Sequence, residues 1–297
     1  MILLTGGNGF LGRYIYDNLI LDFEVMTLSR SSCDYSFDLC DSPPVFNQIF
    51  DLVIHSAGLA HFNPKTVLEE NLFFSTNVKG TENLLIGLER SGIPKKFVYI
   101  SSVLVYGDLS GTLIDESFVV YSNSPFGKSK IEAENIILGW CKKNNVLCTI
   151  LRLPLVLGCN PPGNLGFLIG QIETGFYFNL LGNSSKRSVV LASDVAEFIY
   201  RASEIGGIYN LTDGYHPTFN ELAINISFQL GKGIPKSLPL GFIKMVARLG
   251  DFFGNYFPIN STKLNKITTE LTFNDSKART SFGWKPTKGL EGFSIFN

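Results

Sequence analysis

Apolar positions along this chain follow two different patterns. Runs of four to six consecutive, largely apolar residues lie at 2–5, 24–28, 52–55, 96–100 and 146–151. Runs of this length predict buried strands, and the stretches between them, where apolar residues recur every three or four positions, predict helices. Strands that alternate with helices indicate an α/β fold with a doubly wound parallel sheet.

A change of composition after residue 158 divides the chain. Residues 160–164 are all turn formers, which predicts a loop, and 297 residues exceed the usual size of one domain. We therefore expect a larger domain over 1–158 and a smaller C-terminal domain over 159–297. The strand expected at 207–211 is predicted to return to the main sheet.

The first strand runs into a glycine-rich turn that opens a helix. Gly6 permits a tight turn, Gly9 lets the backbone approach a pyrophosphate, and Gly12 lets the helix pack closely on the strand. Amide groups at the helix N-terminus then face the phosphates. This context predicts a dinucleotide site formed by Gly6, Asn8, Gly9, Phe10, Leu11, Gly12 and Arg13.

The end of the second strand indicates which dinucleotide binds. An acidic residue here would hydrogen-bond the ribose 2′-hydroxyl of NAD, but the chain carries Ser29, Arg30 and Ser31. Arg30, together with Arg13 and the serines, would hold a 2′-phosphate through charge-assisted hydrogen bonds. We therefore expect NADP, with NAD as the alternative.

A motif at 124–130 resembles a known family. Its sequence, Ser-Pro-Phe-Gly-Lys-Ser-Lys, matches six of the seven residues in the Ser-Pro-Tyr-Gly-Lys-Ser-Lys motif of extended short-chain dehydrogenases/reductases that act on nucleotide sugars. Residues 77–85, 101–107 and 276–286 resemble further motifs of this family, so that the likeness covers nearly the whole chain. The resemblance implies a Rossmann-type sheet with a smaller C-terminal substrate domain.

The one mismatch falls on the catalytic position. Phe126 stands where the family has its proton-donating tyrosine, and a phenyl ring has no proton to transfer. The resemblance leaves Lys130 to hold the nicotinamide ribose and Ser102 to hold the sugar oxygen. Two explanations remain open: a naturally inactive or diverted homologue, and an engineered tyrosine-to-phenylalanine change that traps substrate. Tyr106 and Tyr121 are candidates for a substitute phenol.

The resemblance also assigns further binding residues. It places Asp38, Leu39, Ala57 and Pro154 at the cofactor, whereas His55 is expected to be structural. On the substrate side it adds Tyr106 as a pocket wall, and Asn164 and Arg187 as ligands of the sugar diphosphate; a planar guanidinium suits two phosphate oxygens. Asp194 is expected to cap a helix.

The reaction is predicted from the same motifs. Val103 and Leu104 replace the acidic pair of the family's dehydratases, so dehydration is disfavoured. The favoured function is reduction of a UDP-linked 4-keto-6-deoxy-N-acetylhexosamine by NADPH for surface-polysaccharide synthesis. The alternatives are a UDP-sugar 4-epimerase and, from another class, a non-catalytic protein that binds NADP and a nucleotide sugar.

Charge and composition restrict the partners. The net charge of −1 without a basic block argues against nucleic acid, and no apolar stretch is long enough to span a membrane. Five cysteines without a C-x-x-C pair favour free thiols in the cytoplasm, and no metal-ligand cluster is apparent. The resemblance implies a homodimer formed by two helices. The apolar stretch at 238–257 contains Asp251 and only two basic residues, Lys244 and Arg248, so we expect a lid over the sugar pocket there rather than a membrane contact.

Overall fold

A seven-stranded parallel sheet forms the centre of the computed structural model, which describes residues 1–297 except 63, 108–109, 253–259 and 297. The strand order is β11-β7-β5-β4-β1-β2-β3, and every pairing is parallel. The strands are β1 (Ile2–Thr5), β2 (Val25–Ser29), β3 (Tyr35–Ser36), β4 (Leu52–His55), β5 (Lys96–Ser102), β7 (Leu147–Leu153) and β11 (Gly207–Asn210). The order reverses direction between β1 and β4, which confirms a doubly wound, Rossmann-type sheet.

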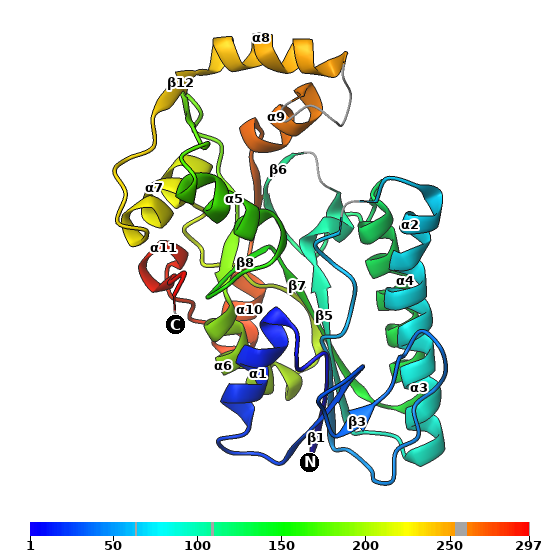
Figure 1. The fold of residues 1–297 in the computed structure, drawn as a ribbon. Helices are drawn as coiled ribbons and strands as arrows, with labels where there is room; N and C mark the ends of the chain where they lie inside the picture. Colours follow the sequence, from blue (N-terminus) through cyan, green and yellow to red (C-terminus); the bar gives the residue numbers. More distant parts are fainter. Residues whose placement is uncertain (63, 108–109, 253–259, 297) are drawn as a thin grey trace.

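Helices cover both faces of this sheet (Figure 1). On one face, α1 (Phe10–Leu19) and α6 (Ala192–Ser203) pack over a core that contains Leu4 of β1. On the other face, α3 (Gly80–Ser91) and α4 (Pro125–Asn144) pack over a core that contains Leu3. Neighbouring strand residues point to opposite faces, so burial on both sides explains the continuous apolar runs in the sequence.

The helical stretch before β5 is divided into three parts. It consists of α2 (Val67–Phe73), a π-helical segment η1 (Phe74–Lys79) and α3. The stretch starts at Val67 because Thr66 caps it: the Thr66 hydroxyl accepts from the Glu69 amide, and the Glu69 carboxylate accepts from the Thr66 amide. This capping box satisfies two otherwise unpaired amides.

The remaining elements build the end of the molecule beyond the carboxyl edge of the sheet, and three two-stranded sheets connect them: β10 with β8, β12 with β9, and β13 with β6. They are η2 (Val103–Tyr106), β6 (Gly111–Ile114), β8 (Leu155–Leu157), α5 (Gly163–Glu173), β9 (Asn179–Leu181), β10 (Val189–Leu191), α7 (Phe219–Gln229), β12 (Ser237–Pro239), α8 (Leu240–Asp251), α9 (Ser261–Thr268), β13 (Leu271–Phe273) and α11 (Gly289–Gly292). Helix α10 (Ser276–Phe282) instead packs beside β11, with Ala278 and Phe282 in the core of the main sheet. Since α6, β11 and Trp284 belong to the main sheet and its cover, residues beyond 158 contribute to both parts of the fold.

The expected cap at Asp194 is wrong. Helix α6 begins at Ala192, and Leu191 occupies the N-cap without a side-chain bond. The Asp194 carboxylate instead accepts from the Thr287 amide, at 2.7 Å. Asp194 therefore joins α6 to the C-terminal segment.

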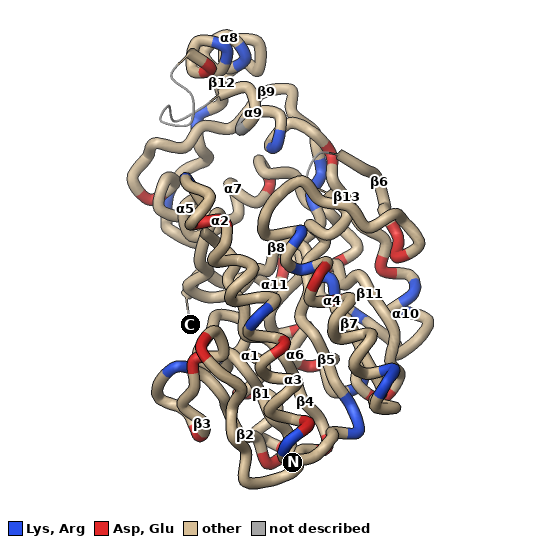
Figure 2. The backbone as a smooth tube through the Cα atoms, turned by 90° about the vertical axis from the view of Figure 1, so that its right-hand side faces the viewer, with Lys and Arg blue, Asp and Glu red and all other residues tan. Residues whose placement is uncertain are grey.

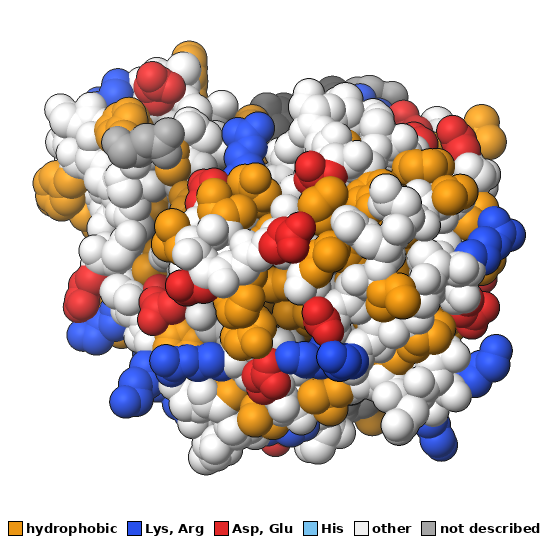
Figure 3. Space-filling view, turned by 90° about the horizontal axis from the view of Figure 1, so that it is seen from below, with side chains coloured by type: hydrophobic (Ala, Val, Ile, Leu, Met, Phe, Trp, Pro, Cys, Tyr) orange, Lys and Arg blue, Asp and Glu red, His pale blue; other side chains and the backbone are white. Residues whose placement is uncertain are grey.

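The described part of the chain contains no disulfide, metal-ligand cluster or membrane-spanning helix. There, all five cysteines are free, and no three His, Cys, Asp or Glu side chains gather as metal ligands. None of the helices in those ranges has the length and apolarity that crossing a bilayer requires. On the face shown in Figure 3, basic and acidic side chains alternate around small apolar areas.

Candidate active site

The glycine turn between β1 and α1 has a shape that only glycine allows. Gly6 has a φ of +72°, and a Cβ there would lie 2.7 Å from the amide nitrogen of Ala57. A Cβ on Gly12 would overlap the carbonyl of Gly6. Gly9 is the N-cap of α1, and neither a capping side chain nor an acidic residue occupies the first turn. The first-turn amides are thus arranged to bind a pyrophosphate.

Asn8 connects this turn to the end of β2. Its side-chain amide donates to the Ser29 hydroxyl, at 3.0 Å, and to the Ser31 carbonyl, at 2.7 Å. The side chain of Arg30 is exposed between these two serines, and so is that of Arg13. The structure thus brings the glycine turn and the proposed 2′-phosphate residues together at one edge.

His55 is buried behind the turn, as expected of a structural histidine. Burial lowers its pKa to about 3, so the ring is neutral. The Thr81 hydroxyl donates to the Asn77 carbonyl and therefore accepts from Nε2 of His55, while Nδ1 accepts from Thr5. Both ring nitrogens are thereby engaged, and the Thr5 hydroxyl also accepts from the amide of Ala57.

Helix α4 carries Phe126 and Lys130 to the ends of the strands. The helix begins where it does because Ser124 caps it, accepting from the amide of Gly127 at 3.1 Å, and Pro125 follows in its first turn. Phe126 is partly buried, and its ring lies 5.8 Å from that of Phe73. No hydroxyl is present at the position where the family has its tyrosine.

The ammonium group of Lys130 lies against β5. It donates to the Ile100 carbonyl at 2.8 Å and to the Tyr99 hydroxyl at 3.0 Å. Burial lowers its pKa to about 8, and the nearby Glu134 carboxylate opposes this shift. Ser102 ends the same strand, and its hydroxyl accepts from the amide of Leu104. The Lys130 ammonium therefore lies against β5 two residues before Ser102, the last residue of the strand.

Asn77 holds α4 to the loop after β4, a role that the sequence did not reveal. Its side chain bonds both backbone groups of Leu59, at 2.7 and 3.1 Å, and the Ser129 hydroxyl, at 2.9 Å. A Cβ on Gly58 would lie 3.0 Å from Oδ1 of Asn77 and 3.6 Å from Nζ of Lys130. Asn77 belongs to the π-helical segment, and such segments often occur at functional sites. In the sequence, the Asn-Val-x-Gly-Thr motif at 77–81 was the signal that could have indicated this role.

The structure argues against Tyr106 as the substitute phenol. Tyr106 is buried, and its hydroxyl donates to Asn210 at 3.0 Å and accepts from the Arg152 guanidinium at 2.7 Å. Burial raises the pKa of this phenol, and the charge of Arg152 opposes the shift. A hydroxyl held in this way is unsuited to replace the missing tyrosine. Tyr121 is exposed and bonds Asn123.

A buried ion pair lies behind Lys130 and was also missed. Arg152 donates to both carboxylate oxygens of Glu134, at 3.1 and 2.6 Å, and both side chains are nearly inaccessible. The Ser101 hydroxyl donates to the same carboxylate at 2.5 Å. Glu134 follows Lys130 by one helical turn, so the pair supports the helix beneath the site. In the sequence, Glu134 and Arg152 each stand in a segment with many apolar residues, and this was the signal that could have indicated the pair.

The remaining predicted residues lie around this centre. Asp38 accepts from the amide of Cys40, and the carbonyl of the buried Leu39 accepts from Asn83. Pro154 follows β7 at the carboxyl edge. Asn164 is exposed in the first turn of α5, and Arg187 donates to the carbonyl of Lys266 in α9.

Comparisons with known proteins agree with this architecture. Residues 2–212 match the model of the NAD dependent epimerase/dehydratase family. The N-acetyl-α-D-glucosaminyl-diphospho-ditrans,octacis-undecaprenol 4-epimerase of Escherichia coli O157:H7 is 26% identical over 299 residues, covering 94% of this chain and 89% of that protein. The UDP-glucose 4-epimerase of Vibrio cholerae is 26% identical over 315 residues, covering 98% and 93%.

A solved structure shows the same fold. RMD from Pseudomonas aeruginosa, complexed with NADPH, superimposes with a TM-score of 0.74 at 19% identity and covers 98% of this chain and 96% of its own. The family model spans well over half of the sequence, and the glycine turn, the parallel sheet and the α4 motif lie within that span. The chain therefore belongs to the NAD-dependent epimerase/dehydratase family.

Proposed function

We propose that this chain binds a nicotinamide dinucleotide and a sugar carried on a diphosphate, and that its fold serves hydride transfer at carbon 4 of that sugar. The observation that supports the proposal is the sheet order: the glycine turn follows β1, Ser102 ends β5 and the Lys130 ammonium bonds β5, all toward the carboxyl edge of one parallel sheet. When bound, the nicotinamide supplies or accepts the hydride. The chain supplies binding, orientation and electrostatics.

Each residue has a task that follows from its position. The first-turn amides of α1 hold the pyrophosphate, and the Lys130 ammonium is placed to hold the nicotinamide ribose. The Ser102 hydroxyl is placed to donate to the sugar oxygen. Phe126 cannot take or return the proton that accompanies the hydride, so the chain in this form binds its ligands but turns them over slowly. Whether Phe126 is natural or engineered does not change this chemistry.

Two reactions share these requirements. We place 4-epimerisation first, because the two full-length relatives described above are named as 4-epimerases. Reduction of a UDP-linked 4-keto sugar is the second candidate, and Arg30 favours it because an exchangeable NADPH is the cofactor of a reductase. The carrier of the sugar is UDP or another diphosphate, and Asn164 and Arg187 are the proposed ligands of its phosphates.

One experiment separates these reactions. The chain and its Phe126→Tyr variant are incubated with UDP-N-acetylglucosamine plus NAD or NADP and, separately, with a UDP-linked 4-keto-6-deoxy sugar plus NADPH. An epimerase forms the C4 epimer without net change in nicotinamide absorbance, whereas a reductase consumes one NADPH for each keto sugar. Binding of both ligands by calorimetry, without turnover by either form, would instead indicate a non-catalytic binding protein.

Arg30→Ala should weaken NADP binding more than NAD binding. A charge-assisted hydrogen bond to the 2′-phosphate would be lost, at about 1–3 kcal/mol, and NAD has no group there. Calorimetry with both dinucleotides measures the difference. Arg90→Ala, which removes an exposed arginine at the far end of α3, is the matched control. Equal losses for NADP and NAD would contradict the assignment.

Arg187→Ala should weaken UDP binding and leave NADP binding unchanged. The guanidinium lies beside α9, away from the glycine turn, and two of its N–H groups suit two phosphate oxygens. Titration with UDP and with NADP measures both affinities. Lys186→Ala removes the neighbouring exposed cation and tests whether general charge suffices. Unchanged UDP affinity in Arg187→Ala would exclude this role.

The stability of the chain should rise between about pH 8 and pH 10.5 through Lys130. Its folded pKa is about 8, below the ordinary lysine value of 10.5, so the unfolded chain binds more protons in this window and stability increases with pH. The full effect is on the order of 3 kcal/mol. Urea unfolding of the chain and of Lys130→Met across this range measures it; parallel pH profiles would contradict the shift.

A further inference from the structure

Helix α8 forms the end of the molecule farthest from the N-terminus (Figures 1 and 2). It packs on the rest of the fold through a narrow face, on which Ile243 and Ala247 are buried with Leu180 and Leu264. The preceding strand β12 pairs with β9, so the start of α8 is anchored in a sheet. Among the described residues, Phe242, Lys244, Met245, Arg248, Leu249 and Phe252 on its other sides are exposed.

The solvent-facing side of α8 carries a stripe of large apolar side chains. The exposed fractions are 50% for Phe242, 55% for Met245, 57% for Leu249 and 87% for Phe252. Spacings of three, four and three residues place them along one side of a helix. Leu181, 62% exposed, pairs in register with Pro239 just before the helix, so that the apolar surface continues onto β9. A contiguous patch of this kind marks an interaction site.

Positive charge accompanies this stripe. Helix α8 carries two basic residues, Lys244 and Arg248, and one acid, Asp251. Both basic side chains are exposed. The Asp251 carboxylate accepts from the amide and hydroxyl of Ser261, which satisfies it within the fold.

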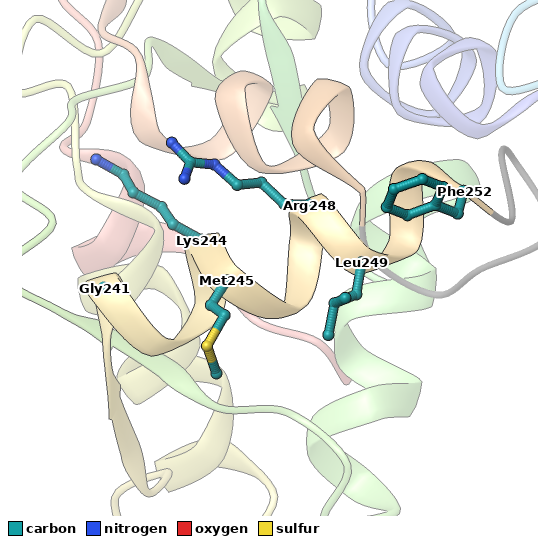
Figure 4. Close-up of a pocket in the computed structure, with 6 residues that line it drawn as sticks. All are labelled: Gly241, Lys244, Met245, Arg248, Leu249 and Phe252. Carbon is teal, nitrogen blue, oxygen red and sulfur yellow. The ribbon is translucent and has the colours of Figure 1, made fainter.

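Figure 4 shows how the two kinds of side chain are arranged. Lys244 and Arg248 extend together from one side of α8, and Met245 and Leu249 extend from another. The same residues line a shallow hollow together with Gly241 and Phe252. The helix thus has an apolar side that is flanked by a cationic side.

We propose that α8 docks this protein onto the surface of an anionic lipid bilayer. An amphipathic helix with Phe and Leu on one side and Lys and Arg beside them lies in the plane of the interface, with its apolar side at the acyl boundary. The cations then meet the lipid phosphates. This inference goes beyond the proposed reaction and does not require a particular sugar carrier.

Two other roles for this surface, contact with a second copy of the chain and closure as a lid over the substrate, fit its side chains less well. In a two-fold contact between copies of α8, Lys244 and Arg248 of one copy would face Arg248 and Lys244 of the other, with the nearby acid already bonded to Ser261. A lid over a sugar diphosphate would need polar contacts, whereas the stripe offers four apolar side chains. An anionic bilayer matches both the apolar and the cationic side.

Vesicle flotation tests the proposal. The full chain is mixed with vesicles of equal parts phosphatidylglycerol and phosphatidylcholine, or of phosphatidylcholine alone, and we expect it to float with the anionic vesicles. Leu249→Glu should abolish this binding. Lys244→Gln with Arg248→Gln should weaken it roughly tenfold to thirtyfold, since each cation near such a surface contributes about 1 kcal/mol. Added salt should weaken it as well.

Matched controls use exposed residues away from α8. Leu21→Glu removes an apolar side chain that is 77% exposed after α1, and Lys142→Gln removes an exposed cation near the end of α4. Both should float like the unaltered chain. Circular dichroism and NADP binding of each variant show that the fold and the cofactor site are retained, which separates this test from that of the reaction.

Three outcomes would overturn the proposal. The first is equal partition of the chain between anionic and neutral vesicles. The second is a dimer in sedimentation that Leu249→Glu dissociates, without vesicle binding, which would assign the stripe to a second copy. The third is a raised KM for a UDP-sugar in Leu249→Glu, again without vesicle binding, which would assign α8 to a lid.

Discussion

Phe126→Tyr is expected to raise turnover by about 10²–10⁴, the usual contribution of general acid–base catalysis. The aromatic ring remains in place, so substrate affinity should change little and the gain should appear in kcat. Lys130 lies one helical turn away, and its ammonium would lower the pKa of the new phenol electrostatically. Steady-state kinetics on the nucleotide sugars named above measures both parameters.

The matched control places the same hydroxyl elsewhere in the same aromatic group. The Phe62 ring lies 5.9 Å from that of Phe73, which in turn contacts Phe126. Phe62→Tyr therefore adds a phenol nearby but outside the motif, and it should not restore turnover. Combining Phe126→Tyr with Lys130→Met should lose most of the gain. No gain from Phe126→Tyr on any sugar, although both ligands bind, would favour a binding protein.

The strands of the main sheet were largely predictable because their side chains are buried on both faces. β4 was predicted with its observed bounds, Leu52–His55. β5 runs two residues beyond the expected Ile100, because Ser101 and Ser102 pair with Arg152 and Leu153 of β7. That extension depends on a partner strand some fifty residues away, which no local pattern reveals.

Short elements that depend on distant partners were not predicted. β6 and β13 are separated by more than 150 residues in sequence and pair only in the folded chain. The apolar residues of the π-helical segment η1, Phe74 and Val78, are four positions apart as in an α-helix, so its wider turns leave no mark in the apolar pattern. Tertiary contacts decide such features.

In the candidate active site, too, local motifs were predictable and contacts between distant segments were not. The glycine turn and the α4 motif could be identified locally, because each works through consecutive backbone groups or one helical turn. The environment of Tyr106 could not be predicted, because its hydroxyl lies between Arg152 of β7 and Asn210 of β11. A motif therefore indicated which residues gather but not where each polar group points.

Removal of either partner of the buried Glu134–Arg152 pair should destabilise the fold strongly. Arg152→Met leaves the Glu134 carboxylate buried with Ser101 as its remaining described partner, and loss of one partner of such a pair typically costs about 3–5 kcal/mol. Glu134→Gln leaves the guanidinium without a counter-charge. Urea unfolding of each variant measures the loss, and Lys79→Met, which breaks the exposed pair with Glu82, should have a much smaller effect.

A double variant that removes both charges decides whether the lost stability comes from breaking the ion pair or from leaving one charge unpaired. Glu134→Leu with Arg152→Met removes both charges and keeps apolar volume, so it should be more stable than Arg152→Met alone. Loss of Glu134 also removes the charge that opposes the lowered pKa of Lys130. In Glu134→Gln the lysine should therefore lose its proton at lower pH, and NADP affinity should begin to fall below pH 8. A double variant as unstable as the sum of Glu134→Leu and Arg152→Met, each measured singly, would show that the pair is not coupled. An unchanged pH profile of NADP binding in Glu134→Gln would show that Glu134 does not act on Lys130.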